Sequence, residues 1–168
     1  MRSLTADSQF IKKTAQSLGF EHCGIARAMP LEEDARRLEQ WLKKGYQGTM
    51  QYMESHFDLR VDPTKLVPGA KSVITLLQNY YPEARQKADT PGISKYAFGK
   101  DYHEVIRAKL KNFLQQIKET IGDIQGRGFV DSAPVLERTW AQKSGLGWVG
   151  KNGNLINKQS GSFYFIAT

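Results

Sequence analysis

The stretch Ser72-Val-Ile-Thr-Leu-Leu-Gln78 decides the fold that we predict for this chain. Its near-continuous apolar run is typical of a central strand that is covered on both faces. Loop-rich sequence precedes this strand over residues 45–71, and a long loop follows it over residues 81–99. A loop of that length inside a compact domain is usually functional or mobile.

On both sides of the central strand the sequence alternates between helical and strand patterns. We expect helices at residues 5–18, 31–44, 101–121 and 134–143, and short strands at residues 20–26, 126–130, 154–156 and 162–166. The last two strands are expected to form a hairpin around residues 158–161. Together the patterns predict an α/β (α+β) class with a layered mixed sheet flanked by helices.

Length and composition exclude several classes of protein. The chain has 168 residues, of which 40% are hydrophobic and 24% charged, as in one ordinary globular domain rather than a disordered, fibrous or coiled-coil chain. It has no 18-residue apolar run and no apolar signal-peptide core, so we expect a cytoplasmic protein that makes no use of a membrane. The single cysteine, Cys23, excludes an internal disulfide and four-thiolate cluster ligation, and we expect it to be a core residue.

The net charge of +7 is distributed unevenly. Residues 1–84 carry 11 Lys and Arg against 10 Asp and Glu, whereas residues 85–168 carry 13 against 7. A basic half favours a polyanionic partner such as nucleic acid or a phosphorylated ligand. An ordinary basic surface explains the same numbers, so charge alone leaves both interpretations open.

A glycine-rich run begins at Gly145 and fits the spacing G-x-G-x-x-G through Gly150. A dinucleotide site needs a strand before this motif and a helix after it, whereas here we expect a helix before it and a hairpin after it. A phosphate-binding P-loop is excluded as well, because Asn152 stands where Ser or Thr is required. Two hypotheses remain: the glycines let the backbone approach a large ligand, or they form a flexible connection.

Asp131 is the most informative carboxylate of the sequence. It follows the predicted strand at 126–130, and ligands of α/β sheets bind beyond the carboxyl ends of strands. Apolar neighbours are expected to desolvate it and so to raise its pKa, as a proton donor near neutral pH requires. In the alternative interpretation, Asp131 or Ser132 only caps the helix that follows.

Several motifs of the chain resemble those of one family, the epoxyqueuosine reductases. They are Gly128-Phe-Val-Asp-Ser-Ala-Pro-Val-Leu-Glu-Arg138, Ala141-Gln-Lys-Ser-Gly-Leu-Gly-Trp-Val-Gly-Lys-Asn152, Tyr96-Ala-Phe-Gly-Lys-Asp-Tyr-His103, Arg60-Val-Asp-Pro63 and Val67-Pro-Gly-Ala-Lys-Ser72. The resemblance runs from about residue 5 to the last residue and covers the family's N-terminal, cobalamin-binding domain, so residues 1–168 are expected to form that domain. The fold that it implies is similar to the nitroreductase-like cobalamin domain of reductive dehalogenases.

The resemblance implies a function in the last step of queuosine biosynthesis. These enzymes reduce the epoxide of epoxyqueuosine in tRNA by two electrons at a base-off cobalamin, with the aspartate that matches Asp131 as proton donor. Two [4Fe–4S] clusters in a following ferredoxin-like domain deliver the electrons. Because this chain stops inside an apolar strand, we expect that domain downstream, and we expect the chain alone to be inactive without it. The partners implied are the modified tRNA and an external electron donor, with the protein a monomer.

Residues matching the family's motifs are the expected cofactor contacts. Leu146, Tyr96 and Trp148 offer apolar cover for the corrin. Backbone and polar groups are expected to contact the amides at its rim. The expected set is Arg60, Tyr96, Ala97, Asp131, Lys143, Gly147, Trp148, Gly150, Lys151, Asn152 and Asn154. We expect no metal ligand, since Asp101-Tyr-His103 begins a D-x-H-x-x-G cobalt motif but Ile106 replaces its glycine.

Two other functions remain open from the sequence. One is a flavin- or cobalamin-dependent reductase of another small substrate, similar to reductive dehalogenases. The other is a non-catalytic, basic RNA-binding module.

Overall fold

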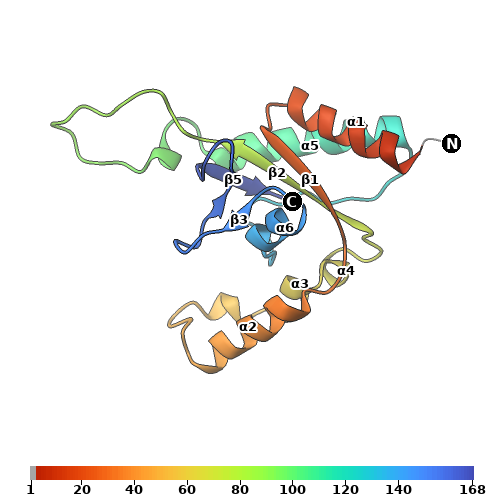
Figure 1. The fold of residues 1–168 in the computed structure, drawn as a ribbon, viewed down its shortest axis with the longest axis horizontal. Helices are drawn as coiled ribbons and strands as arrows, with labels where there is room; N and C mark the ends of the chain where they lie inside the picture. The colour runs from red at the N-terminus through yellow and green to blue at the C-terminus, as the bar shows by residue number, and fades with distance from the viewer. Residues whose placement is uncertain (1–2) are drawn as a thin grey trace.

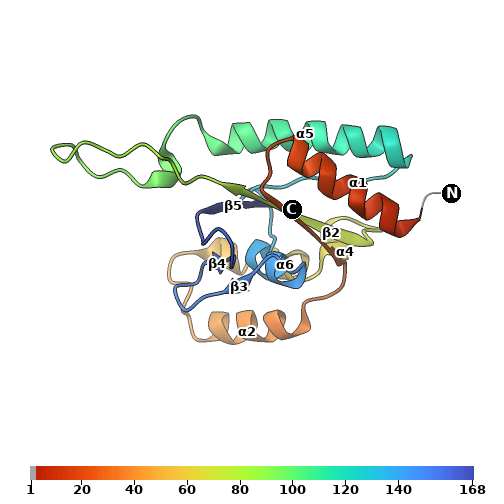
Figure 2. The same cartoon turned by 45° about the horizontal axis from the view of Figure 1, so that its top comes forward.

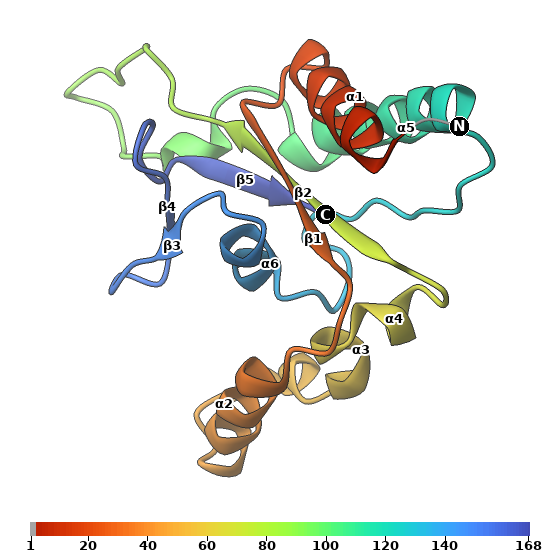
Figure 3. The same cartoon turned by 45° about the vertical axis from the view of Figure 1, so that its right-hand side comes forward.

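The structure, a computed structural model, describes residues 3–168. Its main sheet has three strands in the order β1-β2-β5. Their bounds are His22–Arg27 for β1, Ser72–Asn79 for β2 and Tyr164–Ala167 for β5. Figure 1 shows helices α1 (Leu4–Ser17) and α5 (Tyr102–Ile121) together along one side of this sheet. Helix α6 (Glu137–Lys143) and the short strands β3 (Trp148–Val149) and β4 (Leu155–Ile156) lie on the other side (Figures 2 and 3).

Strand β2 is central because both of its faces are covered, as its apolar sequence predicts. Successive side chains of a strand point to opposite faces. Leu76 accordingly packs into a core with Ile106 and Phe113 of α5. Leu77 packs into a second core with Ala141 of α6 and with Leu146, Leu155 and Tyr164.

The two long helices form where the apolar spacing predicts them. The Ser3 side chain accepts a hydrogen bond from the backbone N–H of Ala6 and caps α1. Asp101 caps α5 in the same way by accepting from the backbone N–H of His103, and Gly122 ends this helix. The apolar stripe of α5 covers the sheet, and Cys23 is half-buried against the same core, so its prediction as a core residue is confirmed.

The segment between β1 and β2 is less regular. Helix α2 has the predicted position, and the loop-rich stretch after it contains three short helical turns. The bounds are Glu32–Lys43 for α2, Gln51–Met53 for η1, Phe57–Val61 for α3 and Pro63–Leu66 for α4. The long loop before α5 contains one further turn, η2 (Lys95–Ala97). Figure 1 shows this loop extending away from the body of the molecule.

The layered α/β class is confirmed, but strand pairing departs from the prediction. Both sheets of the described residues pair only antiparallel strands, so the main sheet is not mixed. The hairpin predicted around residues 158–161 is wrong in its partners, since β4 pairs with β3 and β5 pairs with β2. Only a single bridge between Asn157 and Gly161 joins the two segments. An apolar pattern of two to four residues indicates a strand, but it does not indicate which strand it pairs with.

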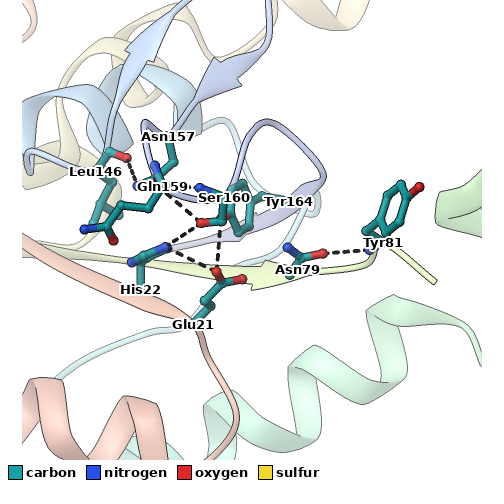
Figure 4. A network of polar contacts seen from close by, with 9 residues as sticks. All are labelled: Glu21, His22, Asn79, Tyr81, Leu146, Asn157, Gln159, Ser160 and Tyr164. Carbon is teal, nitrogen blue, oxygen red and sulfur yellow. Dashed lines mark hydrogen bonds and ion pairs between the residues drawn. The ribbon is translucent and has the colours of Figure 1, made fainter. Parts of the chain in front are cut away.

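A polar network holds the turn between β4 and β5 against the start of β1 (Figure 4). The Asn157 side chain donates to the Leu146 carbonyl at 2.8 Å and accepts from the Gln159 N–H at 2.9 Å. His22 Nε2 lies 3.0 Å from the Ser160 hydroxyl, which also accepts from the Tyr164 hydroxyl. This turn therefore directs β5 away from β4 and onto β2.

Residues 126–130 do not form the predicted strand. Phe129 nevertheless exchanges both backbone hydrogen bonds with Thr168, at 2.7 and 3.0 Å, so the chain passes beside the end of β5. Helix α6 begins at Glu137, three residues later than predicted, because residues 131–136 form an irregular turn. No helix within residues 3–168 is long and apolar enough to cross a membrane.

Candidate functional site

Asp131 lies in this irregular turn and has an unusual backbone. Its φ of 50° is in the left-handed region, which Asp and Asn tolerate better than most residues. Its carboxylate accepts a hydrogen bond from the Tyr102 hydroxyl, and His103 Nε2 lies 3.8 Å from the same oxygen. Both partners come from the first turn of α5, so tertiary contacts fix the orientation of the Asp131 side chain.

The capping interpretation of this aspartate is wrong. The N-cap of α6 is Leu136, which makes no side-chain cap hydrogen bond. The expected desolvation of Asp131 is also not observed, since its side chain remains 49% exposed. A carboxyl group at this site therefore meets solvent and ligand directly.

Tyr102 provides a rigid donor to Asp131. Its ring stacks on Phe165 of β5 at a centroid distance of 3.9 Å and on His103 at 4.0 Å. Burial, followed by the hydrogen bond to Asp131, raises the pKa of Tyr102 well above its usual value of 10. The phenol therefore stays protonated and keeps donating throughout the physiological pH range.

Glu137 is a second carboxyl group beside Asp131. It starts α6, is half-buried, and accepts a hydrogen bond from the backbone N–H of Asp131 at 3.2 Å. Burial and, next, the negative charge of Asp131 raise the pKa of Glu137 from 4.5 to about 8. Glu137 is thus predominantly neutral at pH 7, so the desolvated carboxyl of the site is Glu137 rather than Asp131.

Two clefts meet at this carboxyl pair. The smaller, of about 160 Å³, lies between α6, β4 and β5 and is also lined by Tyr80, Arg138 and Asn154. The larger, of about 470 Å³, lies between α3 and residues 131–137 and is also lined by Tyr52 and Arg60. Asp131 and Glu137 line both, so a ligand in either cleft reaches the same acidic groups.

Arg60 gives the larger cleft an unpaired donor. Its Nη2 donates to the Tyr52 carbonyl at 2.9 Å, whereas its buried Nε has no protein partner. Burial lowers the pKa of Arg60 below its usual 12.5, and a buried donor without an acceptor is unfavourable. This donor suits a ligand that brings an amide or phosphate oxygen into the cleft, and the rim of a corrin carries such amides.

Asn154 lines the smaller cleft, and its neighbours form hydrogen bonds within the β3–β4 turn. The Gly150 N–H donates to the Asn154 carbonyl, and the Asn152 side chain accepts from the Asn154 N–H. Arg138 of α6 donates to the Gly153 carbonyl at 2.7 Å and fixes this turn beside the cleft. The Gly150 N–H is thus already used within the turn, and contact of Gly150 with a cofactor stays a prediction.

The glycines of this run serve packing between strands. A Cβ on Gly147 would stand 2.2 Å from the Ile156 carbonyl oxygen, and one on Gly150 would stand 2.5 Å from the Ile156 side chain. Close approach of β3 to β4 thus explains these glycines. As predicted, a helix precedes the motif, but the hairpin at its end is β3–β4 rather than the predicted one. No helix opens inside the motif, which excludes a dinucleotide-binding turn.

The remaining predicted contacts are not gathered at the clefts. Exposed Tyr96 and Ala97 lie on η2, and Lys143 ends α6. Trp148 is 48% exposed on β3, with exposed Lys151 and Asn152 in the following turn. Leu146, in contrast, is buried in the core and is unavailable as cover for a corrin. Contact of the exposed residues with a cofactor remains a prediction.

Three residues around Asp131 were not predicted as functional from the sequence. Tyr102 and His103 are 29 and 28 residues away along the chain, and no local pattern links them to Asp131. Glu137 is six residues away at a helix start, where an acidic residue is common for reasons of helix dipole alone. His103 also lies 2.8 Å from Asp101, and no group of three metal-ligating side chains was found among the described residues.

The chain is similar in sequence to known proteins. A family model described as "Epoxyqueuosine reductase QueG, DUF1730" matches residues 60–132. An epoxyqueuosine reductase of Cyclobacterium marinum is 57% identical over 99% of this chain and 54% of its own length. Over nearly its whole length, the chain is similar to epoxyqueuosine reductases. The Escherichia coli epoxyqueuosine reductase is 40% identical over 95% of the chain and 43% of its own length.

Solved epoxyqueuosine reductases share the fold. The Streptococcus thermophilus enzyme superposes with a TM-score of 0.86 at 25% identity, covering 95% of this chain and 44% of that one. A second structure, of epoxyqueuosine reductase with an epoxyqueuosine-modified tRNA stem loop, gives 0.83 at 27% identity, with the same coverage. The chain spans about half the length of the curated relatives that it matches.

Proposed function

We propose that this chain is the cobalamin-binding, substrate-reducing domain of an enzyme that converts epoxyqueuosine to queuosine in tRNA. The observation that carries the proposal is the hydrogen-bonded Asp131 at the junction of two clefts, in a chain 57% identical to an epoxyqueuosine reductase. A structure of the Bacillus subtilis enzyme, at 25% identity, is described as having its catalytic aspartate loop swung out of the active site. In the present chain we assign the corresponding role to Asp131, which lies in the turn before α6.

The residues present fit a cobalamin in the larger cleft and on the adjoining surface. Arg60 would hold an amide oxygen of the corrin rim with its unpaired Nε. Exposed Trp148 on β3, which does not line this cleft, is proposed as apolar cover on the strength of the motif that contains it. Tyr96, Ala97, Lys143, Lys151, Asn152 and Asn154 are the further contacts that the family's motifs favour. When bound, the cobalamin supplies the reducing electrons of the reaction.

Asp131 supplies the proton. Opening an epoxide and removing its oxygen develops negative charge on that oxygen, and a carboxylic acid placed beside it neutralises the charge. The Tyr102 hydroxyl holds one carboxylate oxygen of Asp131, which leaves the other oxygen available to carry the proton toward a ligand. A single well-placed proton donor contributes about 10²–10⁴-fold to the rate.

The partners follow from the same proposal. The substrate is a tRNA carrying epoxyqueuosine, and residues 85–168, with 13 basic against 7 acidic side chains, favour a polyanion. Electrons come from an external donor through [4Fe–4S] clusters in a ferredoxin-like domain that follows this region. We propose that the enzyme works as a monomer in the cytoplasm.

Replacing Asp131 by Asn tests the assignment. Asn keeps the size, tolerates the left-handed backbone and still accepts the Tyr102 hydrogen bond, but it carries no transferable proton. In a full-length protein that carries this sequence, we expect turnover of epoxyqueuosine-tRNA to fall by about 10²-fold or more, with melting temperature and cobalamin binding retained.

The matched control is Asp123→Asn, on the exposed turn after α5, which should retain the activity of the wild type. An Asp131→Asn enzyme within a few-fold of the wild type removes Asp131 from the mechanism. Failure of the wild type to bind cobalamin, judged by its visible spectrum, removes the proposed function itself.

A further inference from the structure

Glu137 is not used by the mechanism above, yet it touches the residue on which that mechanism depends. Its Oε1 accepts the backbone N–H of Asp131 at 3.2 Å, and both carboxyl groups line the same two clefts. Asp131 is held at a φ of 50°, a conformation that persists only when surrounding contacts impose it. Backbone and side chain of Asp131 are thus held by different elements, Glu137 of α6 and Tyr102 of α5.

The contact with Glu137 depends on charge. A neutral Glu137 accepts the Asp131 N–H without repelling the Asp131 carboxylate. An ionised Glu137 accepts more strongly, but it then places two negative charges side by side in a half-buried site. The repulsion and the desolvation together outweigh the stronger hydrogen bond, since the pKa of Glu137 is raised to about 8 despite that bond.

Other charged and titratable groups surround this pair. Arg138, next to Glu137 on α6, is the cation that acts on Glu137 most directly and it lowers the pKa. The remaining groups line the two clefts or contact Asp131, and they are Tyr52 on η1, His56, Arg60 on α3, Tyr80, Tyr102 and His103 on α5, and Tyr164 on β5. Among the described contacts, the hydrogen bond of Glu137 is the one with Asp131.

We propose that Glu137 is a positioning residue for Asp131: while neutral it holds the Asp131 turn in the reactive conformation, and its ionisation releases that turn. The role of Asp131 in this inference rests on the proposed function, whereas the contact between Glu137 and Asp131 does not depend on it. The direction of the pH dependence follows from the sign of the pKa shift of Glu137. Since the folded protein binds the Glu137 proton more tightly than the unfolded chain, the stabilisation is complete below about pH 4.5 and is lost as the pH rises through about 8.

Nuclear magnetic resonance of this chain tests the contact without any cofactor or substrate. We expect the backbone amide of Asp131 to shift between about pH 6 and pH 10, with the same midpoint near 8 as the Glu137 side-chain carboxyl carbon. In Glu137→Gln, which stays neutral and keeps an acceptor oxygen, that titration of the Asp131 amide should vanish. In the matched control Glu119→Gln, on the exposed part of α5, it should persist.

Enzyme kinetics separate positioning from a purely structural role. In the full-length protein, wild-type turnover should fall about tenfold per pH unit above about pH 8, because only neutral Glu137 holds Asp131. Glu137→Gln should lose this alkaline fall, and Glu137→Ala, which has no acceptor, should turn over more slowly at every pH.

Either of two results overturns the proposal. One is an Asp131 amide that does not titrate with Glu137 in the wild type, a measurement that needs no variant to fold. The other is an alkaline fall that persists in Glu137→Gln. Loss of cobalamin binding or of turnover in the wild type would instead refute the proposed function, and the amide titration would still decide the role of Glu137.

Discussion

At the scale of single residues, the polar atoms of the site differ in whether they have a hydrogen-bond partner. The Asp131 carboxylate has the Tyr102 hydroxyl, and the Asp131 N–H has Glu137. The buried Nε of Arg60 has no protein partner, although such atoms are nearly always hydrogen-bonded. Arg60 lines the larger cleft, so a ligand that reaches its Nε would supply the missing acceptor.

Arg60→Lys should therefore weaken cobalamin binding. Lys keeps the positive charge and the reach toward the Tyr52 carbonyl, but it has no donor at the position of Nε. A hydrogen bond to a charged group contributes about 1.5–3 kcal/mol, so the Kd for hydroxocobalamin should rise by about 10- to 100-fold. Equilibrium dialysis measures the Kd, and circular dichroism checks the fold.

The matched control for this experiment is Arg37→Lys on the exposed face of α2, where Arg37 pairs only with Glu33. Its Kd should equal that of the wild type. Equal affinities of Arg60→Lys and the wild type would show that the larger cleft does not hold the corrin through this donor.

At the scale of elements, the short β3–β4 hairpin positions one wall of the smaller cleft. The close approach of its strands depends on Gly147, and Arg138 of α6 holds its turn through the Gly153 carbonyl. The hairpin is too short to be stable alone, since an isolated two-stranded hairpin is marginal at best in water. Its shape is therefore set by what it packs against, namely α6 and the core around Leu155.

Gly147→Ala should destabilise the fold through this hairpin. Its Cβ would stand 2.2 Å from a backbone oxygen of Ile156, which cannot move aside as a side chain does. Overpacking of this kind costs about 1–3 kcal/mol, and in a domain of this size each kcal/mol lowers the melting temperature by about 2–4 °C. Differential scanning calorimetry should show a decrease of about 5 °C or more.

Gly92→Ala provides the control, because its Cβ would meet nothing within 4 Å. Its melting temperature should stay at or slightly above that of the wild type. A Gly147→Ala protein as stable as Gly92→Ala would mean that β3 and β4 lie farther apart than described here.

At the scale of the whole molecule, helices α1 and α5 cover one side of the main antiparallel sheet, and α6 with the β3–β4 hairpin covers the other. The carboxyl pair of Asp131 and Glu137 lies where three segments converge. These are the start of α5, the turn before α6 and the start of β5, which meet through Tyr102, Asp131 and Phe165. The basic excess belongs to the half of the chain that contains all three segments. The basic excess and the candidate site therefore lie in the same half of the sequence.

Binding of an epoxyqueuosine-modified tRNA stem loop should accordingly depend on salt. If about six phosphate contacts form, the association constant should fall by about 10³-fold between about 50 and 200 mM salt. Fluorescence anisotropy with the labelled stem loop measures this slope. An affinity that does not change with salt, or no binding at low salt, would contradict the role given to the basic half.

The sequence alone predicted the long helices, the central strand and the helix before the glycine run, and it singled out Asp131 as a candidate. These features are written in local patterns: apolar spacing along α1 and α5, the apolar run of β2, and motifs that the family shares. Strand partners, the turn before α6 and the neighbours of Asp131 were decided only by the tertiary structure. Two-residue strands carry no information on their partners, and Tyr102 reaches Asp131 across 29 residues. Burial of Glu137 likewise depends on several distant segments at once, so desolvation was expected on the wrong carboxyl group.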